Sequence, residues 1–229
     1  MSAPIRVVLV DDQPLFRAGV AAAVDAQPDL TVVGQAGTGV EALALLDGLE
    51  ADVVLMDVRM PEMSGVEATR RLFSPERAAE RATPLRVIVL TTFALDEQAR
   101  AAIQYGASGF LLKDTSPEFL CSAVRAVHAG SPVLAAGDLT ALLAAAAAPP
   151  EAPASVATLT ERERAVFDAA ATGLSNAEIG TALFLSESTV KTHLSSVLGK
   201  LGLRDRVQLV VFAHRHGLAG GGAPAPTAT

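Results

Sequence analysis

The chain has little cysteine and no long apolar run. Its 229 residues include a single cysteine, Cys121, so no disulfide can form within the chain and no metal site can be built from several thiolates. Its longest membrane-like run, LTALLAAAAA, is too short to cross a bilayer, and the N-terminal region lacks the long apolar segment of a signal peptide. These absences predict a cytoplasmic protein with no membrane partner.

Positive charge is also scarce, and it is unevenly distributed. The sequence carries a net charge of −7. Residues 1–151 contain 11 Lys and Arg against 19 Asp and Glu, a net charge of −8, whereas residues 152–229 contain 7 against 6, a net charge of +1. Between these parts, AAAAAPPEAPAS joins an alanine run to prolines and small residues, a composition typical of a linker. We predict domains at 1–130 and 158–218, a partly helical linker at 131–157 and a disordered tail at 219–229.

The first domain alternates short apolar runs with helical patterns. Five runs are short and rich in β-branched residues, as buried strands are: IRVVLV, LTVVGQA, DVVLM, RVIVL and SGFLLK. Five helical patterns alternate with them, and capping pairs or proline mark several helix starts: Thr38 with Glu41, Ser64 with Glu67, and Ser116 before Pro117. Such alternation predicts an α/β domain with a doubly wound, five-stranded parallel sheet and helices on both faces.

Polar residues stand where these predicted strands end. Asp11 and Asp12 follow the first strand, Asp57 the third, Thr91 the fourth and Lys113 the fifth. Ligands of a doubly wound sheet bind beyond the carboxyl ends of its strands, so we expect these side chains to converge on one cleft. Three close carboxylates repel one another unless a cation lies among them, and Mg2+ prefers oxygen ligands. A carboxylate in such a site can attack phosphorus and form an aspartyl phosphate, whose charge the metal and Lys113 would neutralise.

Four segments of the first domain have a specific joint order and spacing. They are DD at 11–12, LMDVRMPEMSG around Asp57, LTT ending at Thr92, and GASGFLLKD with Phe110 and Lys113. Together they resemble the receiver domain of bacterial two-component response regulators. The resemblance implies that Asp57 is the phosphoacceptor. It also implies a Mg2+ site formed by Asp11, Asp12, Asp57 and the backbone carbonyl of Arg59.

The same resemblance assigns a phosphate-binding and switch set: Thr91, Thr92, Phe110 and Lys113. For Phe110 the alternative is an ordinary core position, since phenylalanine is often buried. Two positions depart from the family pattern. Ser64 stands where Asp is frequent, and Asp114 stands where many receivers have Pro after the lysine. Ser64 can still cap a helix, so neither departure threatens the chemistry.

One segment fits a different class of protein. GTGVEA, residues 37–42, matches the G-x-G-x-x-A fingerprint of dinucleotide-binding enzymes, follows a predicted strand, and has Asp57 about twenty residues further on. That fingerprint normally follows the first strand, however. A dehydrogenase function would also leave Asp11 and Asp12, which follow the first strand here, without a role. Glycines in a tight turn capped by Thr38 need no cofactor. We therefore expect Mg2+ and no organic cofactor.

The second domain shows four helical patterns and no convincing strand. Capping pairs mark two helix starts, Thr160 with Glu163 and Ser175 with Glu178, and Ser186 precedes the third helix. That third helix has an apolar stripe at helical spacing: Val190, Leu194, Val197, Leu198 and Leu201. Its opposite stripe is small and polar: Ser188, Lys191, Thr192 and Ser195. A DNA major groove accepts such a helix, and a solvated surface helix would show the same pattern.

A second resemblance favours DNA binding. LTERE, GLSNAEIG, LFLSESTVKTHLSSVLGKLG and RDRVQLV closely resemble the helix-turn-helix domain of NarL/LuxR-type (NarL/FixJ family) regulators. The resemblance implies contacts to double-stranded DNA from Ser188, Thr189, Lys191, Thr192, Ser195, Lys200 and Arg204. Ser195 stands where family members often carry Lys, Arg or Asn, so no base preference is carried over. The resemblance also implies a dimerisation helix with Val207, Val210 and Val211, although these residues could equally close a four-helix core.

Together the two resemblances predict a two-component response regulator, a transcription factor controlled by phosphorylation of Asp57. Such a protein catalyses its own phosphotransfer and dephosphorylation without being a turnover enzyme. The implied partners are a sensor histidine kinase, double-stranded DNA, RNA polymerase, and a second copy of the chain when phosphorylated or DNA-bound. The competing hypothesis is a signalling protein whose second domain binds another protein, and the salt dependence of binding separates the two. The charges of the two parts also predict that the unphosphorylated receiver masks Lys191 or the final helix.

Overall fold

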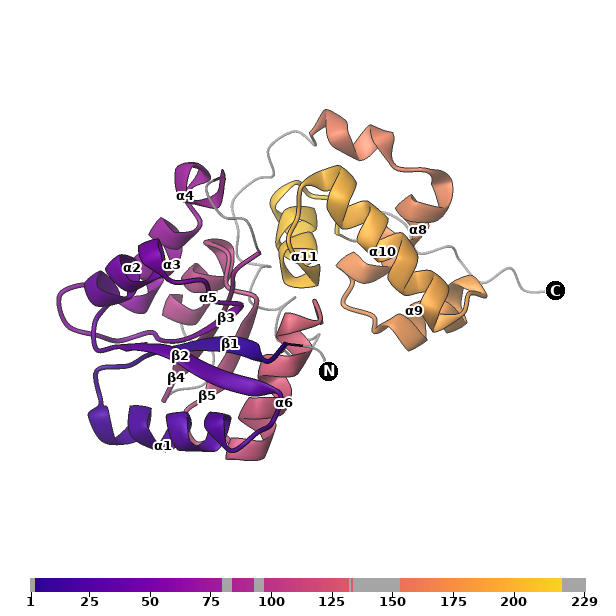
Figure 1. The fold of residues 1–229 in the computed structure, drawn as a ribbon. Coiled ribbons are helices and arrows are strands. Elements are labelled where there is room, and N and C mark those ends of the chain that lie inside the picture. The colour runs from indigo at the N-terminus through magenta and orange to yellow at the C-terminus, as the bar shows by residue number, and fades with distance from the viewer. Residues whose placement is uncertain (1–2, 80–83, 93–96, 132, 134–152, 220–229) are drawn as a thin grey trace. The chain divides into compact units, whose positions relative to one another are not determined.

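Two units, residues 1–134 and 135–229, make up the chain. The computed structural model describes residues 3–79, 84–92, 97–131, 133 and 153–219 (Figure 1). Each unit has its own hydrophobic core cluster. Within the described ranges, no helix combines the length and the apolar character that a membrane span requires.

The first unit contains a five-stranded parallel sheet in the order β2-β1-β3-β4-β5. Its strands are β1 (Ile5–Val10), β2 (Leu30–Ala36), β3 (Val53–Asp57), β4 (Arg86–Thr91) and β5 (Gly109–Leu112). The central strands are buried almost throughout, which explains their uninterrupted apolar sequences. The predicted fold class is confirmed, and both limits of each strand lie within one residue of the predicted ones.

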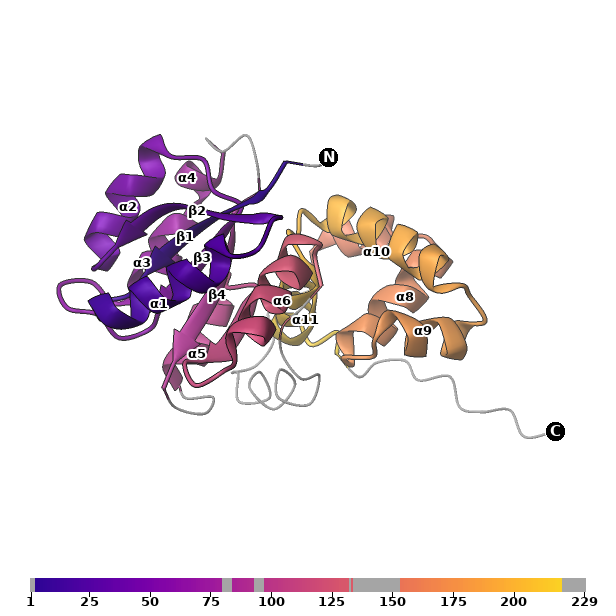
Figure 2. The ribbon, with the colours of Figure 1, turned by 60° about the horizontal axis from the view of Figure 1, so that its bottom comes forward.

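Helices cover both faces of this sheet (Figures 1 and 2). On one face α1 (Pro14–Asp25) and α6 (Pro117–His128) pack over a core that includes Val7, Leu55 and Val124. The other face carries α2 (Gly39–Gly48), α3 (Gly65–Leu72) and α5 (Glu97–Gln104). The sequence pattern predicts five helices here, and the structure adds a short sixth, α4 (Pro75–Ala79). Its first residue is proline, whose fixed φ angle suits the start of a helix.

Capping residues explain several helix starts, although two capping boxes are incomplete. The side chains of Thr38 and Ser64 accept hydrogen bonds from the N–H groups of Glu41 and Glu67, as predicted. The two glutamates do not return the bond. The Glu41 carboxylate accepts from the Gly37 N–H group at 2.6 Å. Glu67 forms ion pairs with the arginines that follow it in α3. In each case the glutamate carboxylate accepts from a donor other than the N–H group of its cap residue.

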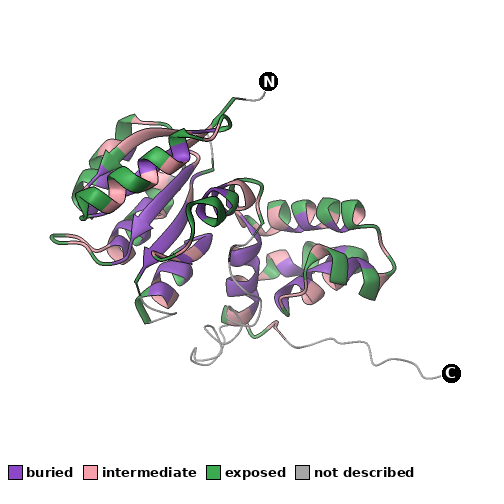
Figure 3. Cartoon of the chain, turned by 90° about the horizontal axis from the view of Figure 1, so that it is seen from below, coloured by how far each residue is buried: buried purple, intermediate pink, exposed green. Residues whose placement is uncertain are grey.

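The second unit is all-helical in its described part. It contains the 3-10 helix η1 (Ala154–Thr158) and the α-helices α8 (Glu161–Ala171), α9 (Asn176–Leu183), α10 (Glu187–Leu201) and α11 (Arg206–Arg215). Complete capping boxes begin α8 and α9, as predicted. The inward faces of these helices are buried and their outward faces are exposed (Figure 3). Phe167, Ile179, Leu194 and Leu209 lie in the shared core, so the predicted four-helix architecture is confirmed.

Most of the expected linker lies outside the described residues, as does all but the first residue of the expected tail. The described ends of the linker carry regular contacts. Val133 pairs with Gly109, and its carbonyl accepts a hydrogen bond from the Phe110 N–H group at 3.2 Å. At the other end, η1 begins within the linker at Ala154, and the carbonyl of its last residue, Thr158, accepts a hydrogen bond of 3.2 Å from Lys200. Each unit therefore extends a short way into the segment 131–157.

Candidate functional site

Three carboxylates lie together at the carboxyl ends of β1 and β3. Each of Asp11, Asp12 and Asp57 offers one oxygen atom within 4.8 Å of the other two. Asp11 and Asp57 are buried, whereas Asp12 is exposed. The strands β1 and β3 are neighbours in the sheet and run parallel, so residues that follow them meet at one edge. The structure thus brings together the acidic residues that the sequence singled out.

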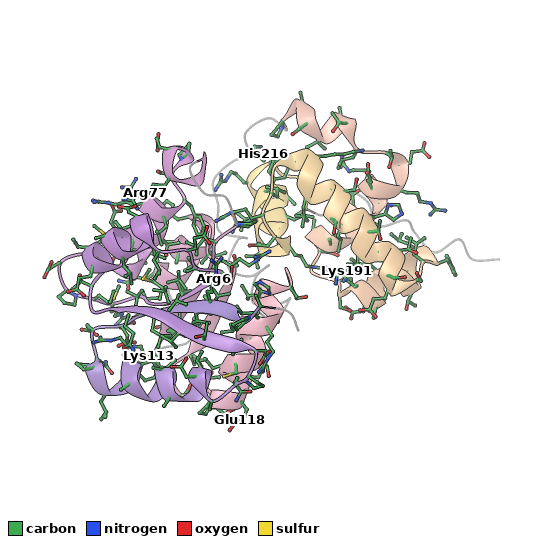
Figure 4. All side chains as sticks on the ribbon, viewed as in Figure 1. Arg6, Arg77, Lys113, Glu118, Lys191 and His216 are labelled. Atoms are coloured by element: carbon green, nitrogen blue, oxygen red, sulfur yellow. The ribbon has the colours of Figure 1, made fainter. Side chains whose placement is uncertain are left out.

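Lys113, which is labelled in Figure 4, follows β5 and reaches the same cluster. Its Nζ atom lies 2.6 Å from Oδ2 of Asp11 and 2.8 Å from Oδ2 of Asp57. The ammonium group also lies 4.9 Å from the centroid of the Phe16 ring, within the range of a cation–π interaction. Burial by itself lowers the pKa of Lys113, but the hydrogen bonds to the two carboxylates outweigh it and raise the pKa above its usual value. Lys113 is therefore a fixed cation at neutral pH.

Asp57 has both carboxylate oxygens in polar contacts. Oδ1 accepts a hydrogen bond of 3.2 Å from the Arg59 N–H group, and Oδ2 accepts one of 2.8 Å from Lys113. Burial raises the pKa of the Asp57 carboxyl, and the hydrogen bond from Lys113 opposes that shift. A dication beside the carboxylate would favour the ionised form further. An ionised carboxylate that is held in one orientation can act as a nucleophile.

Asp11 is also fixed in orientation. Its Oδ1 atom accepts a hydrogen bond of 2.9 Å from the Gln13 N–H group, while Oδ2 pairs with Lys113. The Arg17 guanidinium group donates to the Asp11 backbone carbonyl. These contacts hold the buried Asp11 in place. Asp12 is exposed and is therefore the member of the cluster with the most direct access to solvent.

The predicted switch residues lie at the end of β4, which is next to the strand of Asp57, and on β5, which is the next strand after β4 in the sheet. Thr91 ends β4 and is buried, and its carbonyl accepts a hydrogen bond of 2.8 Å from the Lys113 N–H group. Thr92 follows it and is exposed. Phe110 is half-buried in β5, where it pairs with Val89 of β4. The backbone thus couples β4 to the strand that carries Lys113.

Sequence analysis missed Gly65, which shapes this site. A Cβ atom at Gly65 would lie 1.9 Å from the backbone carbonyl oxygen of Asp57 and 2.8 Å from Cγ of Met56. The Gly65 N–H group donates to the Val58 carbonyl at 3.0 Å. Only glycine allows α3 to begin this close to the strand end. The sequence feature that could have indicated Gly65 is a glycine at the first helical position, directly after the cap residue Ser64, at the end of LMDVRMPEMSG.

The glycine-rich segment 37–42 has a packing role. It follows β2, which is the edge strand, and therefore lies away from the crevice between β1 and β3 where doubly wound sheets bind ligands. A Cβ atom at Gly39 would lie 2.7 Å from the Met63 carbonyl oxygen, so close packing accounts for that glycine. The dinucleotide-binding alternative loses its structural support.

In the second unit, α10 presents one polar, exposed face. Ser188, Lys191, Thr192 and Ser195 are exposed, and Lys191 is labelled in Figure 4. Thr189 is half-buried, and its N–H group donates to the Ser186 hydroxyl, which caps the helix, at 3.2 Å. The opposite face holds the predicted apolar stripe: Val190, Leu194 and Val197 are buried in the core, and Leu198 and Leu201 pack against it. The helix α10 therefore has one apolar face in the core and one polar face exposed to solvent.

Two predicted DNA-contacting residues lie outside this face. The Nζ atom of Lys200 forms an ion pair of 2.6 Å with the carboxylate of the buried Glu163, so a negative charge within the unit offsets the charge of Lys200. The Lys200 hydrogen bond, followed by one from Ser196, lowers the pKa of Glu163 to about 2. Arg204 is half-buried after the end of α10. The DNA roles of Lys200 and Arg204 stay predictions, and Lys200 has an internal contact that the sequence did not indicate.

The residues predicted for dimerisation lie on α11. The core cluster of the second unit takes Leu209 and Ala213 from this helix and has Phe212 packed against it. Val207, Val210 and Val211 are not members of that cluster. All three valines are nevertheless buried in the chain, so their exposure does not mark them as a surface for a second copy, and their role in dimerisation stays a prediction.

Comparison with known proteins decides the family. The family model of the response regulator receiver domain matches residues 7–125. The family model of bacterial regulatory proteins of the luxR family matches residues 157–213. The chain belongs to the NarL/LuxR-type response regulators. Its predicted function as a transcription-regulating response regulator, with a receiver and a LuxR-type DNA-binding domain, is confirmed.

This response regulator has relatives that align over most of their length. It is 42% identical over 218 residues to the uncharacterized transcriptional regulatory protein YxjL of Bacillus subtilis, covering 93% of this chain and 97% of that protein. It is 36% identical over 214 residues to the nitrate/nitrite response regulator protein NarL of Escherichia coli, covering 93% and 96%. It also resembles the solved signal receiver domain of the putative response regulator NarL of Mycobacterium tuberculosis, with 36% identity and a TM-score of 0.51, covering 56% of this chain and 99% of that chain.

Proposed function

We propose that this response regulator binds DNA under the control of phosphorylation at Asp57. The observation that carries the proposal is the contact of the buried Lys113 with both Asp11 and Asp57. A cation fixed beside a potential nucleophile is placed to stabilise the negative charge that arrives with a phosphoryl group. We assign the protein to the cytoplasm, where a sensor histidine kinase supplies the phosphoryl group and DNA and RNA polymerase are the downstream partners.

The acidic cluster fits a Mg2+ ion. Asp11, Asp12 and Asp57 supply its carboxylate oxygens, and hard divalent cations prefer such ligands. The family resemblance adds the Arg59 backbone carbonyl as a further ligand. Lys113 offsets one of the three negative charges, so the cluster can accommodate two further positive charges. A bound Mg2+ ion would supply positive charge to the oxygens of the transferred phosphoryl group.

The chain's own residues divide the work of phosphotransfer. A carboxylate oxygen of Asp57 attacks phosphorus, and the bond from phosphorus to the donor breaks as the donor leaves with its electron pair. Lys113 keeps its proton and balances charge on the phosphoryl oxygens. The Thr91 hydroxyl donates a hydrogen bond to one of these oxygens. Attack of water on the same phosphorus returns the free Asp57 carboxylate, which is the self-catalysed dephosphorylation.

We assign the exposed face of α10 to the DNA major groove. Ser188, Lys191, Thr192 and Ser195 lie there, with Thr189 beside them, and Lys200 and Arg204 are assigned to phosphate contacts nearby. A net charge of only +1 over residues 152–229 gives one copy a weak electrostatic attraction to DNA. Two linked copies bind more tightly than one without any new type of contact. We assign the dimer contact to Val207, Val210 and Val211 of α11 because of the family resemblance; all three are buried in the single chain, so dimerisation must expose them.

Control of DNA binding requires that the receiver favour one state over another. We assign Thr91 and Phe110 to this switch: the phosphoryl oxygens draw the Thr91 hydroxyl inward, and Phe110 on the adjacent strand follows. The acidic residues 1–151, with a net charge of −8, are suited to mask Lys191 or α11 in the unphosphorylated protein. A shift from 1:99 to 99:1 takes about 5.5 kcal/mol, so a partial shift reinforced by dimerisation on DNA is the more economical mechanism.

A phosphorylation assay tests the central assignment. Acetyl phosphate should label the full chain only when Mg2+ is present. Asp57→Asn should abolish labelling, because an amide of similar shape is a poor nucleophile. Asp47→Asn is the matched control, since Asp47 lies on α2, is more than half exposed, and pairs with Arg77 outside the site. Labelling of Asp57→Asn at the wild-type level refutes the assignment of the phosphoacceptor.

A further inference from the structure

Most of the positive φ angles in the described part of the chain occur at glycine. Gly106, Gly130, Gly173, Gly202 and Gly217 adopt them. Among the described residues, only Glu62 and Phe184 do so with a side chain, at φ angles of 62° and 56°. Left-handed backbone is disfavoured for L residues and is unusual for a bulky one. The backbone conformation at position 184 therefore disfavours phenylalanine.

The turn that contains Phe184 is tightly fixed. Phe184 ends α9, and the N–H groups of Phe184 and Leu185 both donate to the Gly180 carbonyl, the second at 2.8 Å. This is the pattern of a helix end whose left-handed residue is usually glycine and sometimes asparagine. A Cβ atom at Gly180 would lie 2.7 Å from the Leu185 carbonyl oxygen, so the turn packs closely on the helix. The backbone conformation at Phe184 follows from this turn.

The Phe184 side chain adds nothing to the core of its unit. It is 96% exposed, whereas its neighbours Leu183 and Leu185 pack against the core cluster. The other exposed large hydrophobic residues, Leu15, Val40, Tyr105 and Phe119, all lie in the first unit. Both the backbone conformation and the solvent exposure disfavour phenylalanine here, which indicates that the ring contacts a binding partner of this unit.

The position of Phe184 indicates which surface it meets. It lies two residues before Ser186, the N-cap of α10, on the approach to the helix that carries Lys191. The first residues of a recognition helix contact base edges, and the chain that leads into it passes the sugar–phosphate backbone. We infer that the Phe184 ring packs on an apolar surface of duplex DNA, either a deoxyribose at the groove edge or a thymine methyl group. This inference rests on the proposed role of α10.

A protein partner fits this surface less well. Interface cores are built from several apolar side chains that become buried together. Phe184 is the sole exposed large hydrophobic residue among those described in the second unit, and the nearby exposed residues include Ser188 and Lys191. A single ring beside hydroxyl groups and a cation matches DNA, whose sugars and methyl groups are small apolar surfaces between charged phosphates.

DNA titration of the full chain, with Mg2+ and acetyl phosphate, tests the inference. The probe is a set of duplexes that the wild-type protein has enriched from a random library. Phe184→Asn should weaken binding about 5- to 30-fold, equivalent to about 1–2 kcal/mol. Its melting temperature should not fall, because asparagine tolerates left-handed backbone. The salt dependence should not change, because no phosphate contact by a charged group is lost. Phe184→Leu keeps an apolar side chain and the same backbone demand, and should retain most of the affinity.

Three comparisons decide between the outcomes. Wild-type affinity of Phe184→Asn overturns the inference, and if that variant then loses transcriptional activity on the same DNA, the ring contacts a protein. Lys191→Ala is measured in parallel, because wild-type affinity of both variants means that α10 does not face DNA and the proposed function of the helix fails too. Replacing thymine by uracil in the duplexes separates the two apolar surfaces. The Phe184→Asn penalty disappears if the ring meets a thymine methyl group and persists if it meets deoxyribose.

Discussion

Replacing Gly65 by alanine tests how closely α3 approaches Asp57, the proposed phosphorylation site. The added Cβ atom would lie 1.9 Å from the Asp57 carbonyl oxygen and 2.8 Å from Cγ of Met56. Close carbon–oxygen contacts in proteins are about 3.3 Å, so the start of α3 and the end of β3 must separate by about 1.4 Å. The oxygen belongs to the backbone and cannot rotate away. The surrounding interior is close-packed and resists such a shift.

The expected loss of stability is large for a single methyl group. Overpacking a core costs about 1–3 kcal/mol, and more where backbone must move, so we expect Gly65→Ala to reduce the free energy of unfolding by at least about 3 kcal/mol. Gly19→Ala is the matched control. Gly19 lies inside α1, and a Cβ atom there has no neighbour within 4 Å. Alanine is favoured over glycine in a helix, so this variant should gain about 0.5–1 kcal/mol.

Urea unfolding followed by circular dichroism measures both variants, and acetyl phosphate labelling measures the site. We expect the two substitutions to change stability in opposite directions. Labelling of Gly65→Ala should fall as well, because a displacement of about 1 Å at a reacting group can cost about a hundredfold in rate. If Gly65→Ala is as stable as Gly19→Ala and is labelled at the wild-type rate, the close approach of α3 to Asp57 is wrong.

Three further predictions concern the second unit. Lys191→Ala should weaken DNA binding by about 1–3 kcal/mol and relax preference at one base pair if the lysine reads a base, whereas an equal loss on all sequences means a phosphate contact. The pKa of Glu163 is lowered from 4.5 to about 2, chiefly by Lys200, so its contribution to stability is complete above about pH 4.5 and is lost as the pH falls toward 2. Thermal unfolding should show Glu163→Gln less stable than wild type at pH 7, with a gap that narrows by pH 3; a constant gap contradicts this coupling. A fragment that begins at Ser155 should bind DNA more tightly than the unphosphorylated full chain, and equal or weaker binding refutes masking and leaves dimerisation as the control.

The sequence by itself determined the architecture of both units. The central strands β1, β3 and β4 are buried almost throughout and are continuous apolar runs, and short runs rich in apolar residues located all five strands to within one residue at either end. Capping pairs located the starts of α8 and α9, because a cap acts over only three residues. The meeting of Asp11, Asp12 and Asp57 followed from the rule that parallel strands end at one edge. These features depend on local composition or on topology.

Only the tertiary structure decided contacts between groups far apart in the chain. Lys113 reaches Asp57 across 56 positions, and Lys200 reaches Glu163 across 37. Nearer in the sequence, spacing allows Glu67 either to complete its capping box or to pair with Arg70 and Arg71 three and four residues on, and the structure decides for the arginines. The need for glycine at position 65 depends on the distance between a helix start and a strand end. The exposure and left-handed backbone of Phe184 depend on how its turn packs on α9, because local sequence supplies candidate contacts and only three-dimensional distances select among them.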